Sequence, residues 1–220
     1  MVRPVFIGCV VAAVLFTVAP AAAQLRIVTY NLAQFQGNAA AIEDVLEFAH
    51  ADDTRGFAQP VAAFIFQEVP SSELNTLAFA LADAAPPGAV YNRATYTNFG
   101  EDGFGGAQVC YYDVNQLTEL PSGHTDINTG AGRWADRWLF AINGYTSSDA
   151  RFYLYSAHLK AGNTPDDINT RATGAASLRN NMLGLPSGSH VVLGGDMNFD
   201  SYLEQGYETL LLFAPSPGQL

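Results

Sequence analysis

The sequence predicts a fold of the α/β class, and two observations carry this prediction. Between residues 25 and 81, strand-like apolar runs alternate with segments whose apolar residues recur at helical spacing. The strand-like runs are apolar almost throughout, which is typical of strands buried on both faces. Hydrophobic residues make up 49% of the 220-residue chain, which is enough for the core of one domain. We therefore expect a single domain in which helices cover buried strands.

The first 23 residues have the features of a secretory signal peptide. Arg3 precedes an almost wholly apolar run over residues 5–19, and the alanines at 21–23 fit a cleavage site. The run is shorter than the ~20 residues that a membrane-spanning helix needs. We expect a secreted or periplasmic protein whose domain covers residues 24–220, with no transmembrane span after cleavage. Cys110 is then the only cysteine, so no intrachain disulfide can form, and we expect a buried thiol.

Two strand–helix units are expected in the first part of this domain. Strands are predicted over residues 25–30 and 61–66, where the side chains are mainly aliphatic or aromatic. A helix is predicted over residues 39–50 from its apolar spacing. A second helix is predicted from about Ser71, with capping residues at its start, to the proline pair that begins at Pro86.

A series of strands is expected in the middle of the chain. Strand-like runs cover residues 107–112, 138–142 and 151–155, and residues 143–150 form a turn between the last two. Residues 121–132 are rich in Gly, Asp, Asn and Thr, so we expect a loop there. The middle of the chain therefore differs from the strand–helix alternation that precedes it.

The last part of the domain returns to a helix followed by a strand. The helix is predicted to begin at Thr164, because Pro165 suits the first helical position and acidic residues follow in the first turn. It runs to about Leu183. The strand begins near His190 and ends at a glycine pair.

Four of the predicted strands end in polar residues that could form one site. These residues are Asn31, Gln67, Glu68, His158, Asp196 and Asn198. Open α/β sheets bind ligands at the carboxyl ends of their strands, so we expect these side chains to converge in one cleft. Carboxylate and amide oxygens suit a hard cation such as Mg²⁺, which also keeps waters and binds substrate phosphate. Zinc prefers His and Cys clusters, and no such spacing occurs in this sequence.

The stretch HVVLGGDMNF, residues 190–199, combines a buried strand with two of these polar residues. If the extended conformation continues past the glycines, a period of two places Asp196 and Asn198 on the same side. Together they could orient a water, hold a hard metal or bond a phosphoryl oxygen. Gly-Asp-x-Asn is also good turn chemistry, so a plain turn is the alternative.

The acidic composition limits the ways in which the protein could bind nucleic acid. The formal net charge is −11, and charged residues make up only 14% of the chain. Such a protein gains no affinity for DNA or RNA from bulk electrostatic attraction. A nucleic-acid substrate would therefore need a local basic patch, or metal ions that screen the phosphates.

Four stretches, taken in order, resemble the endonuclease/exonuclease/phosphatase superfamily, which includes DNase I-like and exonuclease III-like nucleases and neutral sphingomyelinases. They are RIVTYNL (26–32), FIFQEV (64–69), YLYSAHLKAG (153–162) and HVVLGGDMNF (190–199). The resemblance implies a four-layer α/β sandwich, in which two mixed sheets pack together under outer helices. It also implies a metal-dependent phosphoester hydrolase, a nuclease or phosphodiesterase, that uses Mg²⁺ or Mn²⁺ to assist the attack of water on phosphorus.

The resemblance assigns a role to each matched polar residue. Glu68 would be the main metal ligand, and Asn31 would support the metal or the substrate phosphate. His158 would contact the scissile phosphate or share in proton transfer. Asp196 would orient or deprotonate the attacking water, and Asn198 would fix the phosphate or that aspartate.

Two further points of the resemblance concern Arg137 and the end of the chain. Arg137, just before a predicted strand, would match a phosphate-contacting arginine. Superfamily members carry an Asp-His element near the carboxyl end, and no such pair follows Asn198. The resemblance therefore implies that the carboxyl-terminal part of the domain is missing, which would put catalysis in doubt.

The expected partner is a phosphoester substrate, such as nucleic acid or a phospholipid head group, and no stable protein partner is evident from the sequence. Two alternatives remain open at this point. One is a non-catalytic secreted binding module on the same fold. The other is a phosphomonoesterase that acts on small or lipid phosphates.

Overall fold

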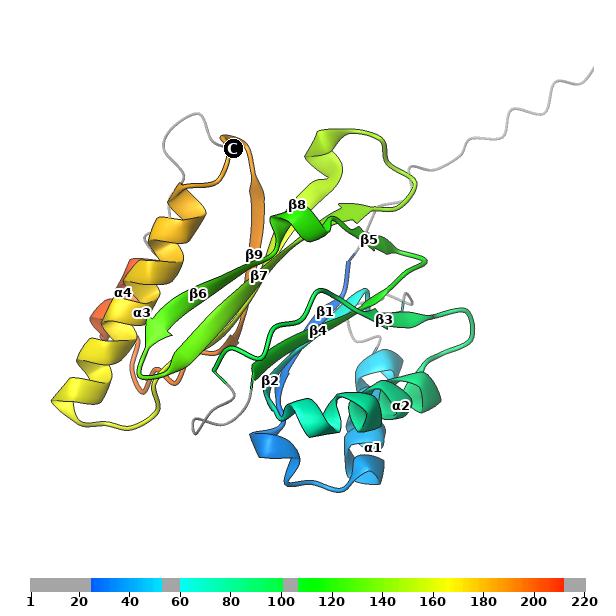
Figure 1. The fold of residues 1–220 in the computed structure, drawn as a ribbon, viewed down its shortest axis with the longest axis horizontal. Coiled ribbons are helices and arrows are strands. Elements are labelled where there is room, and N and C mark those ends of the chain that lie inside the picture. Colours follow the sequence, from blue (N-terminus) through cyan, green and yellow to red (C-terminus); the bar gives the residue numbers. More distant parts are fainter. Residues whose placement is uncertain (1–24, 53–59, 101–106, 212–220) are drawn as a thin grey trace, which may run out of the picture.

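The computed structural model describes residues 25–52, 60–100 and 107–211, and within these ranges two mixed sheets pack face to face with helices on both outer sides (Figure 1). Helices α1 and α2 cover one sheet, and α3 and α4 cover the other. The predicted four-layer α/β sandwich is therefore confirmed. The expected signal peptide and chain end lie outside the described residues.

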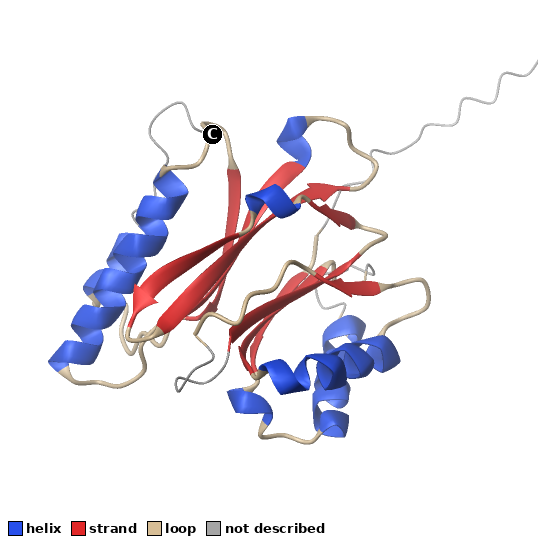
Figure 2. Ribbon diagram, viewed as in Figure 1, coloured by secondary structure: helices blue, strands red, loops and turns tan. Residues whose placement is uncertain are grey.

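The strands form two layers between the helices (Figure 2). The first sheet has the strand order β1-β2-β4-β3, and the second has the order β5-β7-β8-β9, with β6 paired to β7. The strands are β1 (Ile27–Asn31), β2 (Ala63–Val69), β3 (Tyr91–Arg93), β4 (Ala107–Asp113), β5 (Leu117–Glu119), β6 (Thr125–Gly130), β7 (Arg133–Ile142), β8 (Arg151–His158) and β9 (His190–Asp196). The helices are α1 (Ala39–Ala51), α2 (Leu74–Ala84), α3 (Pro165–Leu183) and α4 (Gln205–Leu211). Short 3₁₀ turns are η1 (Ala33–Phe35), η2 (Ser71–Glu73), η3 (Pro121–Gly123) and η4 (Ser148–Ala150).

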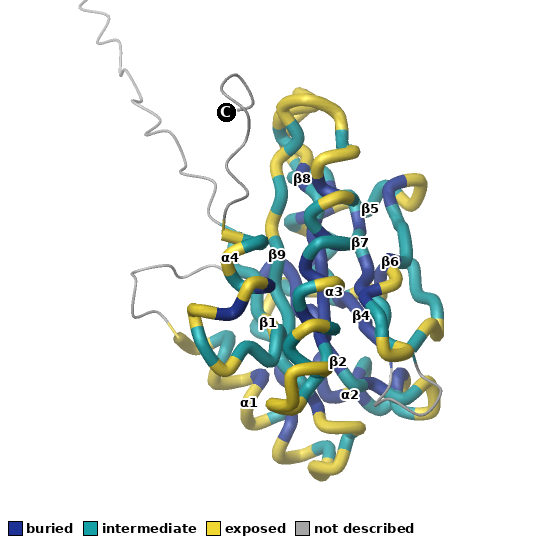
Figure 3. Tube along the Cα trace, turned by 90° about the vertical axis from the view of Figure 1, so that its left-hand side faces the viewer, coloured by how far each residue is buried: buried dark blue, intermediate teal, exposed yellow. Residues whose placement is uncertain are grey.

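Strand β2 shows why the strands are apolar on both faces. Its side chains alternate, so Phe64 and Phe66 point to the helices while Ala63 and Ile65 point to the second sheet. All four are fully buried. Buried residues therefore follow the strands, whereas exposed residues gather on loops and on the outward sides of helices (Figure 3).

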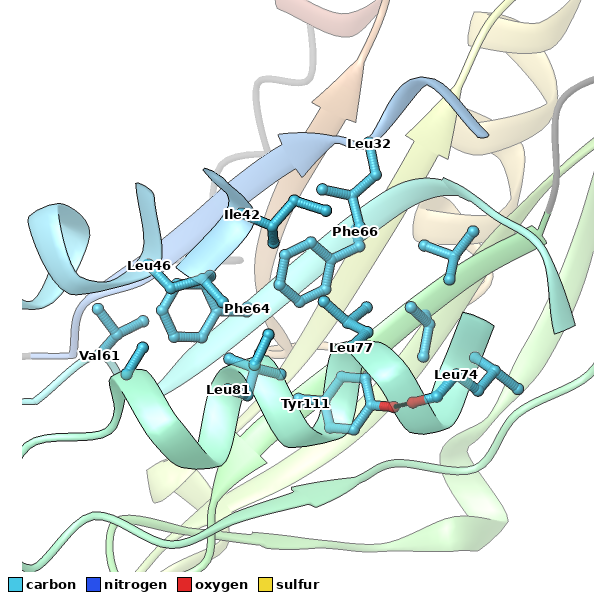
Figure 4. Close-up of a cluster of buried hydrophobic side chains, with 14 residues drawn as sticks. Leu32, Ile42, Leu46, Val61, Phe64, Phe66, Leu74, Leu77, Leu81 and Tyr111 are labelled. Carbon is cyan, nitrogen blue, oxygen red and sulfur yellow. Dashed lines mark hydrogen bonds between the residues drawn. The ribbon is translucent and has the colours of Figure 1, made fainter. Parts of the chain in front are cut away.

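The outer face of the first sheet packs on α1 and α2 (Figure 4). The rings of Phe64 and Phe66 stack with centroids 5.7 Å apart, and Leu77 of α2 lies in the same cluster. Tyr111 of β4 is buried there, and its hydroxyl donates to the Leu74 carbonyl over 2.7 Å. This bond satisfies the one polar atom that the ring brings into the core.

Between the two sheets, a second apolar cluster includes Ile65, Trp138 and Leu154. Cys110 belongs to it as a free, buried thiol, as expected, and burial raises the pKa of that thiol. On the far side of the second sheet, Leu178 of α3 packs on that sheet's outer face. No helix in the described ranges is both long and apolar enough to cross a membrane.

The expected loop over residues 121–132 is wrong in its central part. Residues Thr125–Gly130 form β6, which pairs antiparallel with β7, and β7 begins at Arg133 rather than at residue 138. The turn between them uses left-handed backbone at Gly130, Ala131 and Gly132. The composition of β6 suits a turn, and only its pairing with β7 makes it a strand, because strand propensity depends strongly on context.

Each sheet contains one parallel pair, and these two pairs set the position of the candidate site. β1 runs parallel to β2, with Asn31 opposite Gln67, and β8 runs parallel to β9, with His158 opposite Asp196. β1 also contacts β9 across the two sheets. The carboxyl ends of all four strands therefore lie together.

Candidate active site

Four of the predicted site residues meet where these strands end. The Asn31 side-chain nitrogen donates to Glu68 Oε1 over 3.1 Å and to Asp196 Oδ2 over 3.0 Å. His158 Nε2 lies 3.4 Å from Glu68 Oε1 and 3.8 Å from Asp196 Oδ2. Two carboxylates, an amide and an imidazole from both sheets thus share one site, as the strand ends predicted.

A bulge in β2 aims Glu68 into this site. Simple alternation would place Glu68 on the helix side with Phe64 and Phe66. Instead, the pairing of β2 with β4 shifts between Phe66 and Val69, and Glu68 has a positive φ of 58°. Such bulges redirect side chains next to active sites, and a left-handed non-glycine residue stores strain that the surroundings must hold.

The glycine pair before Asp196 allows β9 to approach its neighbours closely. A Cβ atom on Gly195, whose φ is 133°, would lie 1.9 Å from the Ala157 carbonyl oxygen. A Cβ atom on Gly194 would lie 2.7 Å from the Ile65 side chain in the other sheet. The two glycines therefore bring Asp196 beside both His158 and Asn31.

Asn31 orients the carboxylates in this geometry. Its side-chain oxygen accepts from the Ala33 backbone amide over 2.8 Å, which leaves the nitrogen to face Glu68 and Asp196. Amide orientation is assigned from hydrogen bonds, and all three bonds here agree. The Asn31 nitrogen therefore aligns the two carboxylates, and its predicted support of a metal or phosphate stays a prediction.

Beneath the site, a buried polar network joins the two sheets. Gln67 accepts from the Thr29 hydroxyl over 3.2 Å and donates to the Ser156 hydroxyl over 2.9 Å. Ser156 in turn donates to Gln108 over 2.6 Å. Gln67, Ser156 and Gln108 are all buried, so these bonds fix the relative position of the strands that carry Glu68 and His158.

His158 is an uncharged imidazole at neutral pH. Its side chain is only 3% exposed. Burial, and then the nearby Arg133 guanidinium, lower the pKa of His158 to about 4, while Asp196 acts in the opposite direction. The ring can therefore accept a proton or a hydrogen bond in the site.

Arg133 is a site residue that the sequence reasoning missed. Burial lowers the pKa of Arg133, and the carboxylates of Glu68 and Asp196 oppose that shift, which places its charge near both. One terminal nitrogen donates to the Leu159 carbonyl, and its Nε has no hydrogen-bond partner among the described residues. Its position depends on the β6–β7 hairpin, in a segment whose composition suggested a loop. The sequence therefore carried no signal for it.

Asn198 lies beside Asp196, but the extended conformation does not continue to it. Asn198 has a φ of 51°, its backbone amide donates to Asp196 Oδ1 over 3.1 Å, and its side chain donates to the Leu159 carbonyl over 3.1 Å. The period-two placement of the pair was therefore wrong. Asp196 and Asn198 therefore form a turn, as the alternative predicted, and also belong to the site. The turn holds the Asp196 side chain, which remains 34% exposed.

Arg137 does not join the site. It points to the face of β7 that α3 covers, where it donates to the Gly123 carbonyl, the Asn181 side chain and the Thr125 hydroxyl over 3.1, 2.9 and 2.6 Å. Its guanidinium also lies 5.2 Å from the centre of the Tyr153 ring. These contacts place Arg137 between β7 and α3, so the structure does not bring it together with the other predicted site residues.

An ion pair anchors the loops that follow β8 and β9. Arg171 of α3 is completely buried and donates two 2.8 Å bonds to the Glu204 carboxylate. It also donates to the carbonyls of Lys160 and Gly162 over 3.0 and 2.5 Å. Arg171 therefore ties both loops to one helix.

The donor set suits a hard divalent cation. Glu68 and Asp196 aim carboxylate oxygens at the same amide group, and their side chains are 18% and 34% exposed. Two partly exposed carboxylates match the preference of Mg²⁺ for few protein ligands, several waters and substrate phosphate. Mn²⁺ accepts the same oxygen ligands.

The fold defines the chain as a DNase I-like α/β sandwich. No protein-family model and no curated protein matches the sequence. Solved structures that match include a functionally unknown conserved protein from Enterococcus faecalis V583, with a TM-score of 0.60 and 14% identity over 84% of this chain and 71% of that one.

Two further solved structures also match. The name of one states its protein family, and the name of the other states its bound DNA product. One is an endonuclease/exonuclease/phosphatase family protein from Bacteroides thetaiotaomicron, with a TM-score of 0.55, 17% identity, and coverage of 85% of this chain and 66% of that one. The other is D. rerio TDP2 complexed with a single-strand DNA product, with a TM-score of 0.57, 13% identity, and coverage of 81% and 62%. These likenesses confirm the fold that the four sequence stretches implied.

Proposed function

We propose that the protein is a metal-dependent phosphoester hydrolase that acts on phosphodiesters. The observation that carries this proposal is the meeting of Glu68, His158 and Asp196 around the Asn31 amide, at the carboxyl ends of strands from both sheets. Ligands of α/β sheets bind at such strand ends. The likeness of the fold to an endonuclease/exonuclease/phosphatase family protein supports the same reaction class.

Glu68 is the residue that would hold Mg²⁺ or Mn²⁺, and the Asp196 carboxylate lies on the same Asn31 amide beside it. When bound, the cation would neutralise charge on the phosphoryl group and lower the pKa of a coordinated water. The chain's own contribution begins with Asn31, which holds the two carboxylates in fixed orientations. That preorganisation removes the cost of arranging the ligands during the reaction.

Proton transfer falls to Asp196 and His158. The Asp196 side chain is one-third exposed, so a water can reach its carboxylate and give up a proton to it. His158 is neutral and buried beside the same carboxylate, which allows it to hydrogen-bond a phosphoryl oxygen or relay the proton. Asn198 holds the Asp196 carboxylate through its backbone amide.

Arg133 would bind the substrate phosphate. It places a positive charge near two carboxylates. Arginine pairs well with phosphate oxygens because its donors lie in one plane. Arg133 thus takes the role that the sequence suggested for Arg137.

The net charge of the protein and its expected export both limit the class of substrate. The net charge of −11 disfavours long-range attraction to nucleic acid, so the substrate phosphate is recognised locally by Arg133 and the cation. The TDP2 match was solved with a single-strand DNA product, which makes a short single strand one candidate. A signal peptide would place the enzyme outside the cytoplasm, where nucleic acid and phospholipid head groups are both available.

Hydrolysis of bis(p-nitrophenyl) phosphate by the full-length gene product tests the proposal. We expect turnover that EDTA abolishes and that added Mg²⁺ or Mn²⁺ restores. Asp196→Asn should remove the activity, whereas Glu47→Gln, an exposed carboxylate on α1, should leave it unchanged. Turnover that persists in EDTA contradicts the proposal. Binding of phosphodiesters without turnover also contradicts it and favours the binding module.

A further inference from the structure

A second group of potential metal ligands lies on strands β6 and β7 and at the end of the turn η3. His124, Asp126 and Asp136 each offer one nitrogen or oxygen, and these atoms all lie within 4.8 Å of one another. His124 follows the turn η3, Asp126 lies on β6, and Asp136 lies directly opposite Asp126 on β7. The β6–β7 hairpin, which the sequence composition did not predict, brings these three residues together.

The two carboxylates oppose each other in an unfavourable way. Like charges directly opposite in a sheet repel, and Asp136 is only 3% exposed. In the described ranges, no lysine or arginine forms an ion pair with either of them. A bound cation would neutralise the charge of a buried carboxylate pair of this kind.

His124 points into the same space with an unused nitrogen. Its side chain is 91% buried, and its Nε2 atom has no hydrogen-bond partner among the described residues. That atom lies 3.9 Å from Asp136 Oδ1. A buried, unpartnered nitrogen is uncommon in proteins, which indicates a missing ligand.

We propose that His124, Asp126 and Asp136 bind a first-row divalent cation, with Zn²⁺ preferred over Mg²⁺. One imidazole and two carboxylates suit Zn²⁺, whereas Mg²⁺ prefers oxygen ligands alone. Tetrahedral ligands at about 2.1 Å from the metal stand about 3.4 Å apart. The present spacing needs only small side-chain movements to reach that value.

The surroundings support binding at this point. The Thr97 hydroxyl donates to Asp126 and orients its carboxylate, as outer-sphere partners of metal ligands do. The His124 ring packs against Trp138, with centroids 6.0 Å apart. The cation would join β6, which has a turn-like composition, to β7 and to the end of η3. It is therefore a structural site that stabilises this edge of the second sheet, separate from the catalytic role proposed for Glu68 and Asp196.

Zinc binding to the metal-free 220-residue protein tests this proposal. Competition with a chromophoric chelator at pH 7 should show about one equivalent of bound Zn²⁺ fewer in His124→Gln than in the wild type. The matched control is His190→Gln, since His190 is exposed on β9 and far from the group. Asp196→Asn should keep the equivalent that His124→Gln loses, which separates this site from the proposed active site.

A second variant with a thermal readout guards against a loss of folding. Asp136→Asn keeps the shape of the side chain and removes the repulsion, so it should fold, lose the same equivalent, and lose the rise in Tm that Zn²⁺ gives the wild type. Equal zinc binding in the wild type, His124→Gln and Asp136→Asn would overturn the proposal. So would a Tm that Zn²⁺ does not change.

Discussion

Arg133 brings a positive charge to a site that contains two carboxylates, and we expect it to act on substrate binding. Arg133→Gln should raise KM for a phosphodiester by about tenfold, with a smaller effect on kcat, because a charged hydrogen bond to phosphate is lost. Arg133→Lys should recover part of that loss, since it restores the charge without the planar donors. Steady-state kinetics at saturating Mg²⁺ measure both variants.

Arg137→Gln is the matched control for this prediction. Arg137 bonds only protein groups between β7 and α3, so its loss should lower stability and leave KM unchanged. If Arg137→Gln raises KM as much as Arg133→Gln, the assignment of the phosphate contact to Arg133 is wrong.

His50 makes stability depend on pH in the mildly acidic range. Burial, and then Arg26, lower the pKa of His50 in the folded protein to about 4, from 6.5 in the unfolded chain. A proton therefore binds the unfolded state more tightly. The stabilisation is fully present above pH 6.5 and is lost as the pH falls toward 4. The free energy of unfolding should fall between pH 7 and pH 5. In His50→Leu this fall should be smaller than in the wild type by about 1 kcal/mol. Urea titrations at the two pH values measure this, and an unchanged difference would refute it.

The positions of single residues show which parts of the site the sequence could predict. Asn31, Glu68, His158 and Asp196 follow apolar runs, so the meeting of parallel strand ends brings them together, although a bulge in β2 is also needed to turn Glu68 into the site. The orientation of the Asn31 amide and the left-handed backbone of Asn198 depend on local hydrogen bonds, so strand periodicity could not predict them.

At the level of elements, α3 supports the site through the ion pair of Arg171 with Glu204. Arg171→Met should destabilise the protein by about 2–3 kcal/mol, because it leaves a buried carboxylate and two carbonyl groups without their partner. It should also reduce turnover, since the loops after β8 and β9 lose their anchor. Denaturant unfolding and kcat measure the two effects.

The Arg171–Glu204 ion pair also predicts that the stability of the folded protein decreases at acidic pH. Hydrogen bonds from Arg171 lower the pKa of Glu204 in the folded state, so its stabilisation is lost as the pH falls through that lowered value. Glu204→Gln should weaken this dependence. A stability profile below pH 5 that is identical in Glu204→Gln and the wild type would contradict the role of the pair.

The elements also show where sequence patterns fail. The helix over residues 39–50 and the strands around residues 63 and 154 were predicted closely, because their apolar spacing and their burial agree. β6 was not predicted, because its side chains resemble those of a turn and its partner strand supplies the hydrogen bonds. Arg133 and the group around His124 both depend on that hairpin, so neither could be foreseen.

For the whole molecule, the two-sheet sandwich accounts for the joining of distant segments. Residues that are 165 positions apart, Asn31 and Asp196, share a hydrogen bond because β1 and β9 meet across the sheets. Removal of the first 23 residues stays a prediction at this scale. Amino-terminal sequencing of the exported protein should begin at Gln24, and a retained Met1 would contradict an export signal that is cleaved.

The central claim is that Glu68 holds the cation and that Asp196 accepts the proton of the attacking water. A Mg²⁺ titration of phosphodiester hydrolysis by the wild type, Glu68→Gln and Asp196→Asn tests it most directly. We predict that Glu68→Gln needs more Mg²⁺ and regains part of its activity in excess metal, because it loses a ligand charge. Asp196→Asn should stay at least ~10²-fold below the wild type at every Mg²⁺ concentration, because it loses the proton acceptor. A wild-type metal dependence in Glu68→Gln, or rescue of Asp196→Asn by Mg²⁺, would contradict the account.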